Sequence, residues 1–139
     1  MARYLTDEPL DPARLLAQVA SPGCGAAVLF LGTVRRSAED GDIEGIDYSA
    51  YHEMAEAELS RIVEEARGRW SGARIALLHR LGWVPAGEAS AAIAVACPHR
   101  ADAYAASRFV IDEIKRRVPI WKRERLGSGA SRWVEPAHA

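Results

Sequence analysis

Residues 74–97 read RIALLHRLGWVPAGEASAAIAVAC, and this stretch decides the class of fold. It holds two mostly apolar runs of strand length, residues 74–83 and 88–97, joined by the short segment VPAG at 84–87. A connection this short, with Pro and Gly in it, is typical of a hairpin between neighbouring strands. The stretch therefore favours an α+β domain with a mainly antiparallel sheet.

The pattern continues on both sides of this hairpin as further strands and two long helices. Strands are predicted at residues 2–6, 25–34, 43–51 and 132–135, and helices from residue 12 to before 21, at 54–70, and from 100 to about 117. The run 25–34 is almost continuously apolar, which predicts a strand buried on both faces. No Gly-x-Gly-x-x-Gly or Walker sequence interrupts the pattern, so a nucleotide-binding α/β sheet is not indicated.

Length, charge and hydropathy indicate how many domains the chain forms and which kinds of partner it can bind. The 139 residues are expected to form one domain, and a net charge of -1 gives no overall field that favours nucleic acid. Residues 108–132 nevertheless carry eight basic and three acidic side chains, a local patch that suits a small anion or an acidic partner. No apolar run approaches the ~20 residues of a membrane span, and no signal-peptide core is recognisable, so a cytoplasmic protein is expected.

Only two lysines occur in the chain, Lys115 and Lys122, against sixteen arginines, and they lie on either side of Pro119. Arginine stays protonated in proteins, whereas a crowded or buried lysine can lose its proton and act as base or nucleophile. If the chain turns back across the domain after Pro119, Lys122 faces Lys115, and neighbouring cations lower the pKa of a lysine. Codon bias explains the lysine count equally well, and Lys115 also complements the dipole at a helix C-terminus.

Cationic side chains also stand at two places that attract anions. Arg35 follows the strand 25–34, and His99 and Arg100 begin the helix at residue 100. The N–H groups and the dipole of a helix N-terminus attract anions, and an Arg there calls for a compensating negative charge. Asp102 can supply that charge, and a solvated strand end is a sufficient structural reason for Arg35.

The remaining reactive side chains predict little further chemistry. Cys24 and Cys97 lie far apart and outside any Cys-x-x-Cys pattern, which argues against zinc and against a dithiol pair. Cys97 ends a strand, so a catalytic role for it stays open. Glu124 can orient or neutralise the lysine pair, and the isolated His79 is interpreted as structural, as is His52 elsewhere in the chain.

Taken in order, these residues resemble the large, catalytic subunit of molybdopterin synthase, the MoaE family. The landmarks are FLGTVR at 30–35, YSAYHEMA at 48–55, HRLGWVP at 79–85, EAS at 88–90, HR at 99–100 and KRRVPIWKRE at 115–124. The resemblance covers about residues 25–135, and its most diagnostic part is Pro-x-Trp-Lys-x-Glu at 119–124.

The resemblance implies a fold and a reaction. The fold is an α/β-hammerhead type of α+β domain. The family acts as a sulfurtransferase that installs the dithiolene sulfurs of molybdopterin on cyclic pyranopterin monophosphate, called precursor Z. The sulfur arrives as a thiocarboxylate on the C-terminus of a small, ubiquitin-like MoaD-type subunit. Two large subunits pair as a homodimer within a heterotetramer, and neither a cofactor nor a metal is implied.

The family's functional positions are occupied by matching residues in this chain. The resemblance implies that Lys115 and Lys122 are catalytic. It also implies that the substrate is bound by Thr33, Val34, Arg35, His99, Arg100, Arg123 and Glu124.

Two rival hypotheses remain at this point. The first is a non-enzymatic, anion- or RNA-binding α+β module that uses the basic patch at 108–132, although no aromatics alternate with its basic residues on a sheet face. The second is an inactive subunit that only holds the small partner.

Overall fold

The computed structural model describes residues 3–36 and 41–134. In chain order its elements are β1 (Leu5–Thr6), α1 (Pro12–Val19), β2 (Ala26–Thr33), β3 (Ile43–Ala50), α2 (His52–Arg69), β4 (Arg74–Arg80), β5 (Gly82–Pro85), β6 (Ala89–Cys97), α3 (Arg100–Arg117), β7 (Ile120–Leu126) and β8 (Ser131–Val134). The predicted α+β class and the two long helices, α2 and α3, are confirmed.

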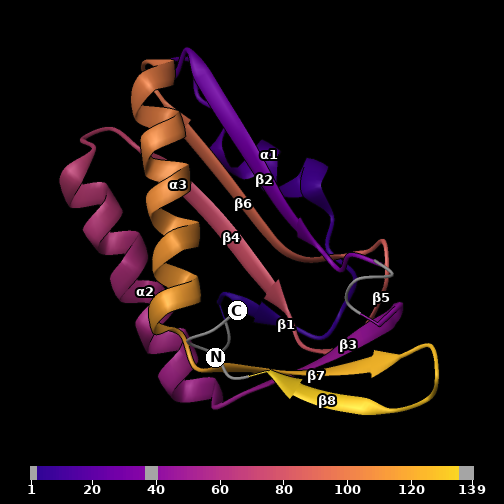
Figure 1. Ribbon diagram of the computed structural model, residues 1–139. Coiled ribbons are helices and arrows are strands. Elements are labelled where there is room, and N and C mark those ends of the chain that lie inside the picture. Colours follow the sequence, from indigo (N-terminus) through magenta and orange to yellow (C-terminus); the bar gives the residue numbers. More distant parts are fainter. Residues whose placement is uncertain (1–2, 37–40, 135–139) are drawn as a thin grey trace.

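The first sheet has the strand order β1-β4-β6-β2 and is covered by helices on both faces. α1 packs on one face and α3 on the other, with α2 beside α3 (Figure 1). β6 lies in the interior of this sheet, and its residues from Ser90 to Cys97 are all buried. Ala92, Ala94 and Ala96 form the β6 surface that packs against Leu15 and Val19 of α1.

The second sheet has the order β5-β3-β7-β8, and its neighbouring strands are all antiparallel. It lies below the C-terminal end of α3 in Figure 1, because β7 starts directly after the helix and the Val118-Pro119 bend. Apart from the short β1, which runs parallel to β4, the first sheet is antiparallel as well. The mainly antiparallel pairing predicted from the sequence is therefore confirmed.

The predicted hairpin is correct in its pairing and wrong in its connection. β4 and β6 are antiparallel neighbours, with Ile75 opposite Val95. The predicted single strand at 74–83 is interrupted, however, because Gly82 has a φ of 85°, a conformation that glycine adopts readily and an extended strand does not. Residues 82–85 consequently leave the first sheet and pair with β3 as β5 of the second sheet.

Two other sequence predictions are corrected by the sheet order. The strand at 25–34 is not buried on both faces, since β2 is the edge of the first sheet and Leu31 is 38% exposed. The segment 119–124 was expected to turn back across the domain but not to be a strand, and its residues 120–124 belong to β7, which lies between β3 and β8. The strand was not predicted because many of its residues are charged, although exposed and partly covered side chains alternate along β7.

Most other boundaries agree with the predictions, but β1 covers only residues 5 and 6 of the strand predicted at 2–6. Asp11 caps α1 and accepts a hydrogen bond from the Arg14 N–H at 3.3 Å, and the long helices begin at His52 and Arg100. Residues 2 and 135, the outer ends of two predicted strands, lie outside the described residues. None of the described helices is both long and apolar enough to span a bilayer.

Candidate active site

A cavity of about 480 Å³ lies where the two sheets meet the C-terminal end of α3. The charged side chains that line it are Arg35, Lys115, Lys122 and Glu124, and the neutral polar ones are Thr33, Tyr48, His79 and Ser90. Apolar side chains, among them Phe30 and Ile111, form much of the remaining wall. An apolar wall with a few convergent polar groups is typical of a small-molecule site.

The end of α3 and the start of β7 bring both lysines to this cavity. Lys115 lies in the last helical turn, and Pro119 then stops the helix because it lacks the N–H that a continuing helix needs. Successive strand residues point to opposite faces of a sheet. Lys122 and Glu124 therefore share the face that lines the cavity, whereas Arg123 between them is exposed on the other face.

The two lysines bring two amines to the cavity, and neither amine has a direct ion-pair partner among the described residues. Burial lowers the pKa of Lys122, the positive charge of Lys115 lowers it further, and Glu124 opposes both effects. In residues 3–36 and 41–134, neither lysine forms an ion pair or hydrogen bond through its amine. A larger share of Lys122 is consequently neutral near physiological pH than for an exposed lysine.

Glu124 does not neutralise the lysines by direct contact, because its carboxylate is engaged elsewhere. Oε1 of Glu124 accepts a hydrogen bond from Nε of Arg132 at 2.8 Å, and Nη2 of Arg132 lies at 2.7 Å. Arg132 lies opposite Glu124 in the β7–β8 ladder. The predicted role for Glu124 as the neutralising partner of the lysine pair is therefore not seen in the contacts, although its charge still acts on Lys122.

Thr33, Val34 and Arg35 form another part of the wall. The backbone of Val34 is held at both of its polar groups. Its N–H donates to the Glu88 carbonyl at 2.9 Å, and its own carbonyl accepts from the Gly87 N–H at 2.7 Å. These bonds fix the chain just beyond β2 and present Arg35 at the cavity.

A set of neutral polar groups forms the floor that β3, β4 and β6 contribute. The Tyr48 hydroxyl donates to Ser90 Oγ at 3.1 Å, and the Ser90 hydroxyl donates to the Gly32 carbonyl at 3.3 Å. The His79 ring meets the Tyr48 ring edge-on, with 5.2 Å between centroids. Nδ1 of His79 lies 2.9 Å from the Arg80 carbonyl, which can only accept, so Nδ1 carries the proton.

His79 is an uncharged member of this cationic site. Burial lowers its pKa to about 4, and the charges of Lys122 and Lys115 act in the same direction. The hydrogen bond to the Arg80 carbonyl opposes that shift without cancelling it. The imidazole is therefore neutral near pH 7. Burial likewise raises the pKa of Tyr48, so its hydroxyl keeps its proton.

Three predicted site residues lie outside this cavity within the single chain. His99 and Arg100 are at the N-terminal end of α3, and fifteen residues of helix place Arg100 about 22 Å from Lys115 along the axis. Arg123 lies on the far face of β7, 3.7 Å from the Asp47 carboxylate and over the Trp133 ring. Their roles in substrate binding stay predictions.

The sequence model described as MoaE protein matches residues 5–117 of this chain. The chain belongs to the MoaE family. A molybdopterin synthase catalytic subunit from Culex quinquefasciatus is 43% identical over 134 residues, which cover 94% of this chain and 85% of that relative. Molybdopterin synthase from Staphylococcus aureus has the same fold with a TM-score of 0.90 at 34% identity, covering 96% of this chain and 98% of that one.

A similar fold also occurs in a complex of subunits 1 and 2 of molybdopterin-converting factor from Helicobacter pylori 26695. The TM-score is 0.76 at 22% identity, and the match covers 95% of this chain and 88% of that chain. At this identity the likeness concerns the fold alone.

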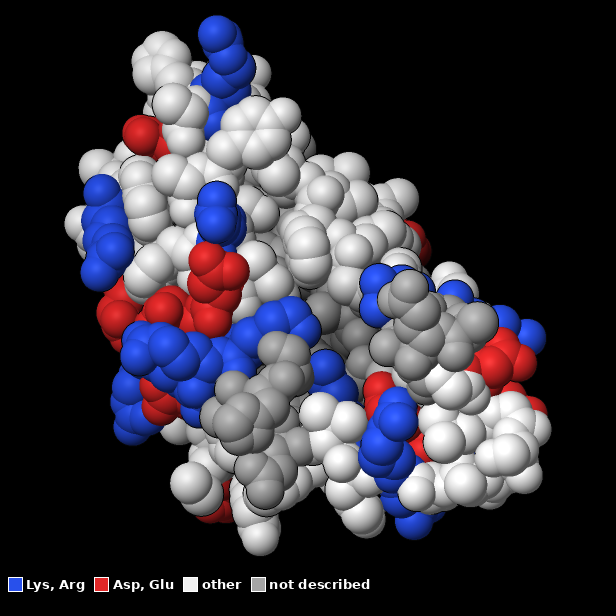
Figure 2. Space-filling model, in the orientation of Figure 1, with Lys and Arg blue, Asp and Glu red and all other residues white. Residues whose placement is uncertain are grey.

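The RNA-binding alternative finds no support in this MoaE-family chain. Figure 2 shows Lys and Arg side chains intermixed with Asp and Glu over the lower part of one face, rather than gathered into one basic patch. Several of the basic residues predicted to form such a patch are paired with carboxylates, among them Arg116, Arg117 and Arg132.

Sequence reasoning missed three residues of the site. His79 was interpreted as structural, and Tyr48 and Ser90 were not assigned a role. The signal for His79 was present, because it shares the buried face of β4 with Leu77 and Ile75 at a spacing of two residues. His79 and Lys122 line the same cavity from strands of two different sheets, and no local sequence pattern indicates that these strands lie close together.

Proposed function

We propose that this MoaE-family chain is the catalytic subunit of a molybdopterin synthase. It transfers sulfur from a C-terminal thiocarboxylate of a small ubiquitin-like subunit to precursor Z. The observation that carries the proposal is the pair Lys115 and Lys122, brought to one cavity by the bend at Pro119 and left without an ion-pair partner among the described residues. Family membership supports the same reaction.

The charge of the cavity suits the substrate. Arg35, Lys115 and Lys122 place three cationic groups around a space of about 480 Å³, which lies within the usual size range of small-molecule sites. The cyclic phosphate of precursor Z and a thiocarboxylate are both anions and are attracted to such a site. The apolar wall around Phe30 and Ile111 offers a surface for a flat heterocycle.

The lysine amines can supply the proton transfers that sulfur transfer requires. Sulfur transfer forms a bond between the thiocarboxylate sulfur and a carbon of the substrate, and an oxygen substituent leaves that carbon. The bond between sulfur and the acyl carbon then breaks, and water attacks the acyl carbon and restores a carboxylate on the small subunit. These steps exchange protons, which a lysine with a lowered pKa can take up and return near neutral pH. A neutral amine is also a nucleophile, so Lys122 can attack the acyl carbon as the bond from that carbon to sulfur breaks, and water then cleaves the resulting amide.

The partner assignment is supported by a fold that occurs in a two-subunit complex. The H. pylori neighbour is a complex of subunits 1 and 2 of molybdopterin-converting factor. We assign this chain a small MoaD-type partner whose extended C-terminal tail enters the cavity, and a cytoplasmic location. His99 and Arg100 cannot reach the cavity of their own chain, so their part in substrate binding requires a second copy of the chain, as in the proposed homodimer.

Reconstitution tests the proposal directly. The purified chain is mixed with a thiocarboxylated small subunit and precursor Z, and the dithiolene product is measured. Product formation is expected with thiocarboxylated partner and not with the same partner bearing a plain carboxylate. A complex that forms with the partner but yields no product would instead support the inactive-subunit hypothesis.

A further inference from the structure

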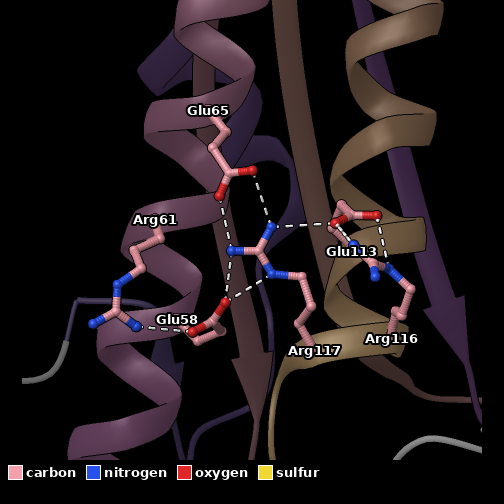
Figure 3. Close-up of polar contacts among 6 residues, drawn as sticks. All are labelled: Glu58, Arg61, Glu65, Glu113, Arg116 and Arg117. Atoms are coloured by element: carbon pink, nitrogen blue, oxygen red, sulfur yellow. Dashed lines mark hydrogen bonds and ion pairs between the residues drawn. The ribbon is translucent and has the colours of Figure 1, made fainter.

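The last turn of α3 is tied to α2 by a cluster of ion pairs centred on Arg117 (Figure 3). Nε of Arg117 donates to Glu58 at 2.7 Å, and its two terminal nitrogens donate to the two oxygens of Glu65 at 3.1 and 2.8 Å. Nη1 also donates to Glu113 of α3 at 3.2 Å. One guanidinium therefore joins three carboxylates from two helices.

The geometry of this cluster is specific to an arginine. The paired contact with Glu65 uses the planar fork of the guanidinium, which an ammonium cannot reproduce. The Arg117 side chain is 20% exposed, and Glu58 and Glu113 are 22% and 15% exposed. Without Arg117, Glu58 keeps its contact with Arg61 and Glu113 keeps its contact with Arg116. The ion pairs that join α2 to α3 would nevertheless be lost, and the carboxylates of the two helices would repel one another across the gap.

The cluster stands between the two lysines in the chain. Arg117 is two residues after Lys115 and five residues before Lys122, and it directly precedes the Val118-Pro119 bend. The position of the bend determines where β7 starts and where Lys122 enters the cavity. Contacts that fix the C-terminal end of α3 therefore also fix the distance between the amines of the two lysines.

Arg116 provides a matched comparison at the neighbouring position. It also pairs with Glu113, but the contact stays within α3, and its side chain is 69% exposed. None of the contacts described for Arg116 reaches α2. Arg116 and Arg117 thus carry the same charge at similar distances along the chain from both lysines, and only Arg117 links the helices.

We infer that Arg117 is a positioning residue that holds Lys115 and Lys122 at their working separation by tying the end of α3 to Glu58 and Glu65 of α2. The inference rests on the proposed function only in assigning the chemistry to the lysines. The placement of the two amines is a property of the chain alone and can be measured without substrate or partner.

The lysine count makes that measurement unusually direct. Because the chain has two lysines, protein labelled with ¹³C at the lysine Cε gives one NMR signal from each, assigned with Lys115→Arg and Lys122→Arg. The charged and titratable groups that share the cavity with Lys122 are Arg35, Lys115, Glu124, Tyr48 and His79, and all are kept in the variants compared. The titration of the Lys122 signal then reports on its surroundings.

Arg117→Gln is expected to raise the titration midpoint of Lys122 by about 0.5 pH unit, because a loosened bend lets water reach the amine and separates it from Lys115. Arg116→Gln removes the same charge and is expected to shift the titration midpoint of Lys122 by much less. A folded Arg117→Gln variant whose Lys122 titrates as in the unchanged protein would overturn the inference, as would equal shifts in both variants.

Two further measurements keep the test decisive. If Arg117→Gln does not fold, Glu65→Gln loosens the same link from the α2 side, and its Lys122 midpoint is expected to shift in the same direction by a smaller amount. An unchanged midpoint in Glu65→Gln then counts against the inference. In the reconstituted reaction, Arg117→Gln is expected to lower kcat more than it raises KM. Failure of the unchanged chain to make product would refute the proposed function while leaving the NMR result valid.

Discussion

Tyr48 and Lys122 are direct neighbours across the antiparallel ladder of β3 and β7, and both side chains line the cavity. Side chains that lie opposite each other in such a ladder share one face of the sheet and stand close together. The Tyr48 hydroxyl donates its proton to Ser90, and no hydrogen bond joins it to the Lys122 amine in the part of the chain that the structure describes. This arrangement contributes to the burial that lowers the pKa of Lys122.

Replacing either lysine by arginine is expected to abolish most activity without unfolding the chain. Lys115→Arg and Lys122→Arg keep the positive charge but remove the titratable amine, and loss of a general acid–base group costs about 100-fold or more in rate. Product formation in the reconstituted reaction measures the effect, with thermal melting and partner binding as controls. Full activity in both variants would refute the assignment of these amines.

The reaction is expected to speed up with rising pH as Lys122 loses its proton. Its pKa is lowered by burial and by Lys115, so the midpoint of this rise lies below the ordinary lysine value of about 10.4. The pH dependence of kcat/KM measures it. The remaining activity of the Lys122→Arg variant should not show this rise of kcat/KM with pH. If the rise persists in that variant, another group is responsible for the titration.

Arg35→Ala is expected to weaken binding of precursor Z. A hydrogen bond to a charged group contributes roughly 1.5–3 kcal/mol, which corresponds to about a 10- to 100-fold loss of affinity. Calorimetric titration of the substrate measures the loss. Arg36→Ala is the matched control, because Arg36 is exposed and outside the cavity, 3.8 Å from Asp42. Equal affinities of the two variants would remove Arg35 from the substrate site.

Mixing two inactive variants tests whether a second copy completes the site. A His99→Ala, Arg100→Ala double variant and a Lys122→Arg variant should each be inactive when alone. Mixed dimers contain one cavity with all groups intact if His99 and Arg100 act across the dimer, so part of the activity should return. Activity that stays absent in verified mixed dimers would show that the His-Arg pair does not serve the partner's cavity.

His79 is expected to make the fold sensitive to acid. Its folded-state pKa of about 4 lies below its ordinary value of 6.5, so the unfolded chain binds the proton more readily between these values. The free energy of unfolding should therefore be unaffected above pH 6.5 and fall as the pH drops toward 4, by about 3 kcal/mol at most.

Denaturant unfolding of the unchanged chain and of His79→Asn, measured at pH 7 and pH 5, isolates this contribution. Asn keeps an N–H near the position of Nδ1 but cannot take up a proton, so the variant should lose less stability between the two pH values. Glu58 and Glu65, whose pKa values are lowered chiefly by hydrogen bonds from Arg117, add acid sensitivity only below about pH 4.5 in both proteins.

Local patterns were sufficient for the elements and for part of the site. The apolar stripes and the caps predicted α1, α2 and α3, because helical spacing is a property of neighbouring residues. Proline chemistry predicted the end of α3 and the return of the chain that brings Lys122 toward Lys115. The same local reasoning could have separated His99 and Arg100 from Lys115, since helical rise alone puts them about 22 Å apart.

Sheet membership was beyond local patterns. The sequence alone determined that the chain alternates strands and helices, pairs its strands mainly antiparallel, and carries two amines on either side of a proline. Only the tertiary structure decided that β2 is an edge strand, that residues 82–85 join a second sheet, and that Tyr48, His79 and Ser90 meet the lysines in one cavity. The physical reason is that strand order and contacts between sheets depend on packing between residues far apart in the chain, which neither spacing nor composition records.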